Sequence, residues 1–196
     1  MANISIEDLK KLKELSGVGL TDAKNALVEA DGDFDKALDA MRKKGLTKAE
    51  KRGDRETREG LVDSYVHDGR IAAIVEVNCE TSFVAKTDEF KTLAHQLAMQ
   101  VASMNPLYVS EEDIPADVRE KKMKELEENF KGPENMKEKI LEGQAKKAFA
   151  DKVLMNQPYI LDDSKTVAEF IKEAIAKTGE NITVRQFKRI ELGVTE

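Results

Sequence analysis

Near residue 61 the spacing of apolar residues changes to a period of two, and this change constrains the fold more than any other feature of the sequence. The stretch LVDSYVHDGRIAAIVEVNCE, residues 61–80, has β-type periodicity on both sides of Asp68-Gly69. An Asp-Gly pair supplies the positive φ angles of a tight turn, so the stretch predicts a β-hairpin. A lone hairpin is marginally stable at best, so other elements must cover or extend it.

Such elements are predicted downstream of the hairpin. Residues 182–192, ITVRQFKRIEL, predict a third strand, and their imperfect alternation is compatible with a bulge. Capping residues and breaks predict four helices: one after Thr87 that Pro106 closes, two charged segments separated by Gly132-Pro133, and one after Thr166 with Glu169 completing a capping box and Gly179 as its stop. Residues 60–196 are therefore predicted to be an α+β core, an antiparallel sheet covered by helices.

Residues 1–45 are predicted to form a compact set of three helices. Ser5 is expected to cap the first helix and Thr21 the second, and Gly45 is expected to end the third. Apolar residues recur at helical spacing in the three segments: Leu9, Leu12 and Leu15; Ala23, Ala26, Leu27 and Ala30; Phe34, Ala37, Leu38 and Met41.

The two regions are joined by a basic segment. Residues 42–58, RKKGLTKAEKRGDRETR, contain eight basic and three acidic residues. We interpret the segment as a solvated linker, assigned to residues 46–59, or an exposed helix, because it lacks the interleaved aromatics of a nucleic-acid surface. A net charge of −6 also disfavours nucleic acid as the main partner and favours a protein.

The N-terminus and cysteine usage indicate a cellular location. The first residues, MANISIEDLKKLK, do not resemble a signal peptide, and Cys79 is the single cysteine. Apolar runs are shorter than the ~20 residues that a membrane span needs. We therefore expect a soluble, cytoplasmic protein without membrane contact.

The sequence shows no catalytic constellation. Gly17 and Gly19 lack the preceding strand and the further residues of a phosphate loop, and residues 31–42 fail the calcium-loop pattern. His67, His95 and Cys79 have no neighbours at metal-ligand or nucleophile spacing. We therefore expect no enzyme activity, no metal and no cofactor, and a packed thiol at Cys79.

Phe83 is ambiguous at this point. It lies in ETSFVAK, residues 80–86, the short connection between the second strand and the helix after Thr87. It could fold back as a lid on the seam between sheet and helix. It could equally be an exposed anchor for a partner, since connections run over the surface.

Two stretches carry a resemblance to a known family. LKELSGVGLTDAKNAL, residues 12–27, resembles one signature of the translation elongation factor Ts family, with Lys13 where arginine is usual. EVNCETSFVAK, residues 76–86, resembles its second signature, with Ser82 where aspartate is expected. The similarity extends to MNPLYVS, EGQAKKAF and the terminal GENITVRQFKRIELG.

The resemblance implies a guanine nucleotide exchange factor for elongation factor Tu. Residues 1–45 would form a three-helix domain similar to ubiquitin-associated domains, and their contact residues would be Lys13, Val18, Gly19, Leu20, Thr21 and Lys24. The loop formed by Thr81, Ser82, Phe83 and Val84 would dislodge Mg from the partner, with the Phe83 ring inserting between helices of the GTPase. Ser82 keeps hydrogen bonding but lacks the charge of aspartate, so we expect exchange to be retained with altered affinity.

The short form of the family also implies a homodimer, whose core would serve dimerisation. Two other functions remain open. The N-terminal domain could be an adaptor that binds a protein without promoting exchange, or residues 42–58 could bind RNA with strongly salt-dependent affinity.

Overall fold

The computed structural model describes residues 5–16, 19–130, 132 and 136–194. Its contacts fall into two units. The first contains the chain up to Asp63 together with Glu76–His95 and Glu169–Val184, and the second contains Ser64–Val75, Gln96–Ala168 and the residues from Arg185 onward.

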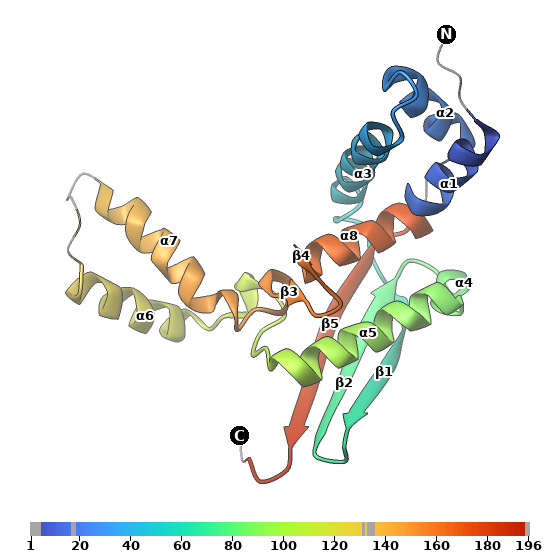
Figure 1. The fold of residues 1–196 in the computed structure, drawn as a ribbon. Coiled ribbons are helices and arrows are strands. Elements are labelled where there is room, and N and C mark those ends of the chain that lie inside the picture. The colour runs from blue at the N-terminus through green and yellow to red at the C-terminus, as the bar shows by residue number, and fades with distance from the viewer. Residues whose placement is uncertain (1–4, 17–18, 131, 133–135, 195–196) are drawn as a thin grey trace. The chain divides into compact units, whose positions relative to one another are not determined.

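Three helices at the N-terminus confirm the predicted helical set (Figure 1). They are α1 (Ile6–Ser16), α2 (Leu20–Glu29) and α3 (Phe34–Glu50). Their core contains the predicted apolar positions Leu12, Ala23, Leu27 and Met41, all buried. The Ser5 hydroxyl accepts a hydrogen bond from the backbone N–H of Asp8 (2.9 Å), as expected of a helix cap.

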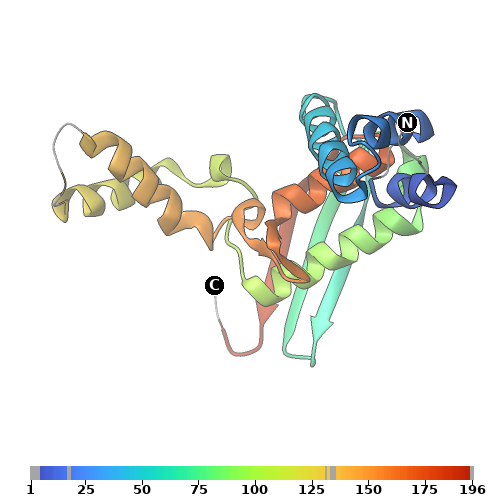
Figure 2. The ribbon, with the colours of Figure 1, turned by 45° about the horizontal axis from the view of Figure 1, so that its top comes forward.

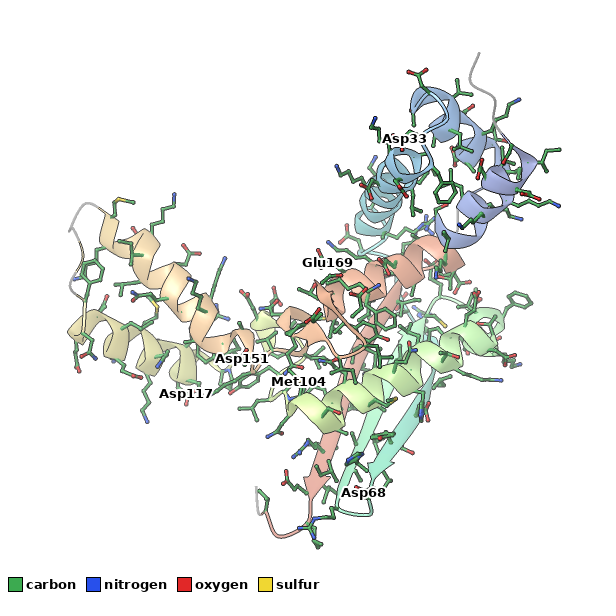
Figure 3. The ribbon with its side chains drawn as sticks, in the orientation of Figure 1. Asp33, Asp68, Met104, Asp117, Asp151 and Glu169 are labelled. Carbon is green, nitrogen blue, oxygen red and sulfur yellow. The ribbon has the colours of Figure 1, made fainter. Side chains whose placement is uncertain are left out.

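Asp33 (Figure 3) caps the N-terminus of α3. A helix cap explains an aspartate at this position better than a calcium-binding loop does. Its Oδ1 accepts the backbone N–H of Lys36 at 3.1 Å. That hydrogen bond, followed by contacts with the Lys36 side chain, lowers the pKa of Asp33 below its ordinary value.

Two predicted helix boundaries in this region are wrong. Thr21 does not cap α2, because the backbone is already helical at Leu20 and the extended Gly19 (φ −66°, ψ 152°) occupies the cap position. Gly45 does not end α3, which continues to Glu50. A glycine inside a helix costs only about 0.5–1 kcal/mol, and burial of Ala49 beyond it helps to offset that cost.

The predicted hairpin and third strand form one antiparallel sheet in the order β1-β2-β5. Its strands are β1 (Glu59–His67), β2 (Ile71–Cys79) and β5 (Ile182–Glu191). The turn has positive φ at both Asp68 (47°) and Gly69 (64°), as an Asp-Gly hairpin requires. The alternation of burial along β5 is interrupted at the exposed pair Arg185 and Gln186.

A long helix covers the sheet, as Figures 1 and 2 show from two directions. This helix is α5 (Asp88–Met104), and the Thr87 hydroxyl caps it by accepting the backbone N–H of Phe90 (3.2 Å). Within the first unit, His95 Nδ1 lies 3.4 Å from Asp63 Oδ2 on β1. Within the second, Arg189 Nε on β5 donates to the Ala102 carbonyl at 3.0 Å. Met104 ends the helix (Figure 3), just before Pro106 as predicted.

The second unit also contains two charged helices that pack on each other. They are α6 (Ala116–Glu128) and α7 (Lys137–Ala150), and they lie on either side of the predicted break. The predicted break residue Pro133 itself lies outside the described residues. Short 3₁₀ turns, η1 (Glu111–Asp113) and η3 (Leu154–Asn156), flank the pair.

A second, two-stranded sheet was not predicted. It pairs β3 (Pro158–Tyr159) with β4 (Asp162–Thr166) in antiparallel orientation. The buried Gln100 and Gln157 hold it, because Gln100 Nε2 donates to Gln157 Oε1 (3.1 Å) and Gln100 Oε1 accepts the N–H of Ile160 (2.9 Å). The helix α8 (Val167–Thr178) follows and ends, as predicted, at Gly179, whose φ is 78°.

Candidate functional site

The connection between β2 and α5 is a single helical turn, α4 (Ser82–Ala85). Thr81 is its N-cap, with extended backbone (φ −129°, ψ 149°) and a side chain that accepts the backbone N–H of Val84 at 3.4 Å. At the other end, the Thr87 N–H donates to the Val84 carbonyl (3.0 Å) and the Thr87 hydroxyl donates to the same oxygen (2.8 Å). The turn is therefore tied to the rigid elements on both sides.

Phe83 points away from the protein. Its side chain is 80% exposed, whereas Val84 and Ala85 are only 7% and 8% exposed. Successive side chains on a helical turn diverge by about 100°, so packing of Val84 and Ala85 drives Phe83 outward. The interpretation of Phe83 as a seam lid is therefore wrong, and an exposed aromatic remains.

The other predicted residues of this loop have different environments. Ser82 and Thr81 are exposed, so they lie on the same accessible turn as Phe83. Val84 is buried, so its side chain anchors the turn by packing against the protein.

Two carboxylates join the end of β2 to the segment just before β5, and one of them, Glu180, holds the base of the turn. The Glu180 carboxylate accepts two hydrogen bonds from Thr81, from Oγ1 at 2.6 Å and from the backbone N–H at 3.0 Å. In the reverse direction, Glu80 Oε1 accepts the backbone N–H of Asn181 at 2.6 Å. The buried Asn181 amide in turn donates to the carbonyls of Arg55 (2.7 Å) and Gly53 (3.1 Å). Sequence reasoning missed Glu180 and Asn181 as parts of this site, although they lie in the GEN sequence just past the predicted helix stop.

The hydrogen bond from the backbone N–H of Asn181, aided by the positive charge of Arg55, lowers the pKa of Glu80 below its ordinary value. A lowered pKa means that the ionised form stabilises the fold above about pH 4.3 and that this contribution is lost as the pH falls through the lowered pKa. We expect Glu80→Gln to reduce the free energy of unfolding at pH 7, with the difference from the unmodified protein shrinking below about pH 4. Urea unfolding from pH 3 to 7 measures this, and a difference that is constant with pH would contradict it.

Cys79 is the packed thiol that the sequence predicted. It is fully buried, and its Sγ lies 3.2 Å from the Thr81 carbonyl oxygen. Burial, with a smaller effect of the Glu180 charge, raises the pKa of the thiol, so it stays protonated and unreactive near neutral pH.

The N-terminal helices carry a second group of predicted contact residues. Lys13, Gly19, Leu20, Thr21 and Lys24 are all exposed, and Val18 lies outside the described residues. Leu20 and Lys24 are one turn apart on α2, so they share one face. The sequence reasoning missed Val28, which continues this exposed face one turn further and is signalled by the spacing of four.

Among the described residues, no three His, Cys, Asp or Glu side chains converge to hold a metal ion. In the same part of the chain, no helix combines the length and apolar character needed to cross a bilayer. An exposed aromatic on a fixed turn and an exposed helix face that carries Leu20 and Val28 beside Lys24 are typical of protein-binding surfaces. Fold and site together define an α+β protein equipped to bind another protein.

The comparison with known proteins is specific. The family model described as "Elongation factor TS" matches residues 45–194. Elongation factor Ts of Thermotoga maritima is 53% identical over 192 residues, covering 97% of this chain and 96% of the relative. Elongation factor Ts of Fervidobacterium nodosum is 47% identical over 194 residues, covering 97% and 98%. The chain therefore belongs to the elongation factor Ts family.

Proposed function

We propose that this protein is a guanine nucleotide exchange factor for elongation factor Tu during translation elongation. The observation that carries the proposal is the exposure of Phe83, 80%, on a turn that is capped at both ends. A side chain in this setting is available to a partner without first breaking packing contacts of its own. The function needs no catalytic group or cofactor, since the protein acts through binding alone.

The mechanism follows from thermodynamic linkage, because GDP and this protein both bind elongation factor Tu. GDP is held in elongation factor Tu largely through Mg and phosphate contacts, so a protein that stabilises a conformation with those contacts displaced weakens GDP binding. GDP reciprocally weakens binding of that protein. Phe83 supplies the wedge between helices of the GTPase, Ser82 lies beside it, and Thr81 and Val84 fix the turn.

A second contact would come from the N-terminal domain. The proposed contact residues are Lys13, Val18, Gly19, Leu20, Thr21 and Lys24. The proposed division is a ubiquitin-associated-like domain (1–45), a basic linker (46–59) and a core (60–196), although α3 continues into the linker as far as Glu50 and β1 begins at Glu59. This second surface supplies affinity while the α4 turn supplies the effect on Mg and GDP.

The protein is further proposed to be a cytoplasmic homodimer without direct nucleic-acid or membrane contact. Exposed apolar side chains on the hairpin and β5 of the second unit, Val66, Ile74 and Ile190, support an interface between copies. Mass measurement at low micromolar concentration tests this. A species of 21.9 kDa alone, forming a one-to-one complex with the partner, would contradict the dimer.

Release of labelled GDP from elongation factor Tu, with and without the protein, tests the exchange function. We expect release to accelerate with increasing protein until the rate saturates. Binding to elongation factor Tu with an unchanged release rate would instead support the adaptor function.

A further inference from the structure

Glu180 lies at the corner between α8 and β5, where Gly179 adopts a positive φ of 78°. Both of its carboxylate oxygens are used by one residue, Thr81: Oε1 by the hydroxyl and Oε2 by the backbone N–H. The two residues are 99 positions apart in the sequence, so only the fold brings them together.

This contact fixes the rotation of the Thr81 side chain. A hydroxyl has one proton and two lone pairs, and the Glu180 carboxylate accepts that proton at 2.6 Å. The lone pairs of Thr81 Oγ1 are thereby left for the backbone N–H of Val84, which donates at 3.4 Å. Without the carboxylate the hydroxyl is free to rotate, and the N-cap of the turn is lost for part of the time.

The cap controls where Phe83 is held. The Thr81 carbonyl accepts the N–H of Ala85 at 3.2 Å, so both the hydroxyl and the carbonyl of Thr81 hold the four-residue turn. A helix this short has little stability of its own. Its conformation depends on the capping contacts, and the exposed Phe83 side chain contributes none of them.

We propose that Glu180 is a positioning residue for nucleotide exchange, because its bidentate contact with Thr81 preorganises the α4 turn that presents Phe83. The inference rests on the proposed exchange function. A wedge that is ordered only part of the time engages the partner less often, in proportion to the ordered fraction.

The corner offers a matched control. Glu80 lies just after β2, next to Thr81, and reaches toward β5. Its carboxylate contacts Asn181 and Arg55 and not Thr81. Glu80→Ala therefore removes a carboxylate of the same size from the same place while leaving the cap of the turn intact. This variant shows how far exchange changes when the contacts between the end of β2 and the segment just before β5 are weakened without loss of the cap.

The first measurement uses the isolated protein. We expect Glu180→Ala to speed hydrogen exchange at the amides of Thr81, Val84 and Ala85 by about fivefold or more, and Glu80→Ala to leave these amides unchanged. Equal exchange at these three amides in Glu180→Ala and the unmodified protein would overturn the positioning role.

The second measurement is stimulated GDP release from elongation factor Tu at increasing concentrations of each variant. We expect Glu180→Ala to lower the saturating rate about fivefold and to change the half-saturating concentration less, because the N-terminal surface is intact. Partial unfolding alone would remove active protein, raising the half-saturating concentration at an unchanged saturating rate. That pattern would overturn the proposal.

Conservative variants and a double variant complete the test. Glu180→Gln keeps an acceptor oxygen, so its saturating rate should lie between those of Glu180→Ala and the unmodified protein. Thr81→Ser keeps the hydroxyl, so its saturating rate should be close to that of the unmodified protein. Because Glu180→Ala and Thr81→Val remove one interaction, their double variant should be no slower than the slower single variant. Additive losses would overturn the proposal.

If the unmodified protein fails to stimulate release, the exchange function itself fails, whereas normal stimulation by Glu180→Ala rejects only the positioning role.

Discussion

Phe83→Ala is expected to lower stimulated GDP release from elongation factor Tu by about 30- to 150-fold. We take about 2–3 kcal/mol for an aromatic anchor at the centre of an interface, and each 1.36 kcal/mol corresponds to about tenfold in rate. The expected loss follows because Phe83 is the large apolar side chain that α4 exposes. Release of labelled GDP at saturating protein measures it.

The variant is well suited to the test because it should fold normally. Phe83 is exposed, so its removal should change the free energy of unfolding by no more than about 0.5 kcal/mol. Lys86→Ala is the matched control, since Lys86 is an exposed residue next to the same turn. Phe83→Leu should fall between the two. Unchanged stimulation by Phe83→Ala would reject Phe83 as the wedge.

Gly60→Ala is expected to have the largest effect on stability, a loss of about 3–5 kcal/mol. Gly60 has φ of 154°, and a Cβ there would lie 2.2 Å from the Val77 carbonyl oxygen and 2.8 Å from the Asn78 Cα. Both atoms belong to the backbone of β2, so relief requires moving β1 from its neighbour. Overpacking costs about 1–3 kcal/mol, and a strained backbone conformation costs about 1–3 kcal/mol more. Thermal unfolding should show a fall of about 10 °C in the midpoint.

Two other glycines allow the cost of steric overlap and the cost of backbone strain to be measured separately. Gly69 also has a positive φ, 64°, but open space around its Cα, so Gly69→Ala should cost only about 1–2 kcal/mol. Gly143 lies inside α7 with open space, and Gly143→Ala should stabilise the protein by about 0.5–1 kcal/mol. A Gly60→Ala variant no less stable than Gly69→Ala would contradict the close approach of β1 and β2.

Local signals predicted the elements that are long or have strong turn chemistry. The Asp68-Gly69 turn and the apolar spacing of α5 are encoded within a few residues, so hairpin and helix follow from the sequence. The β3–β4 pair is not encoded locally, because β3 has two residues and β4 is polar, DDSKT. Its formation depends on Gln100, which reaches Gln157 and Ile160 from α5.

The sequence by itself determined the three-helix start, the hairpin, the third strand and Phe83 as a residue in question. It did so because periodicity, caps and turns act between residues close in the chain. Whether Phe83 packs or points outward was decided only by the tertiary structure, through the burial of Val84 and Ala85. The contact of Glu180 with Thr81 has the same origin. Thr81 lies just after β2 and Glu180 just before β5, so they meet only because these two strands are neighbours in the sheet.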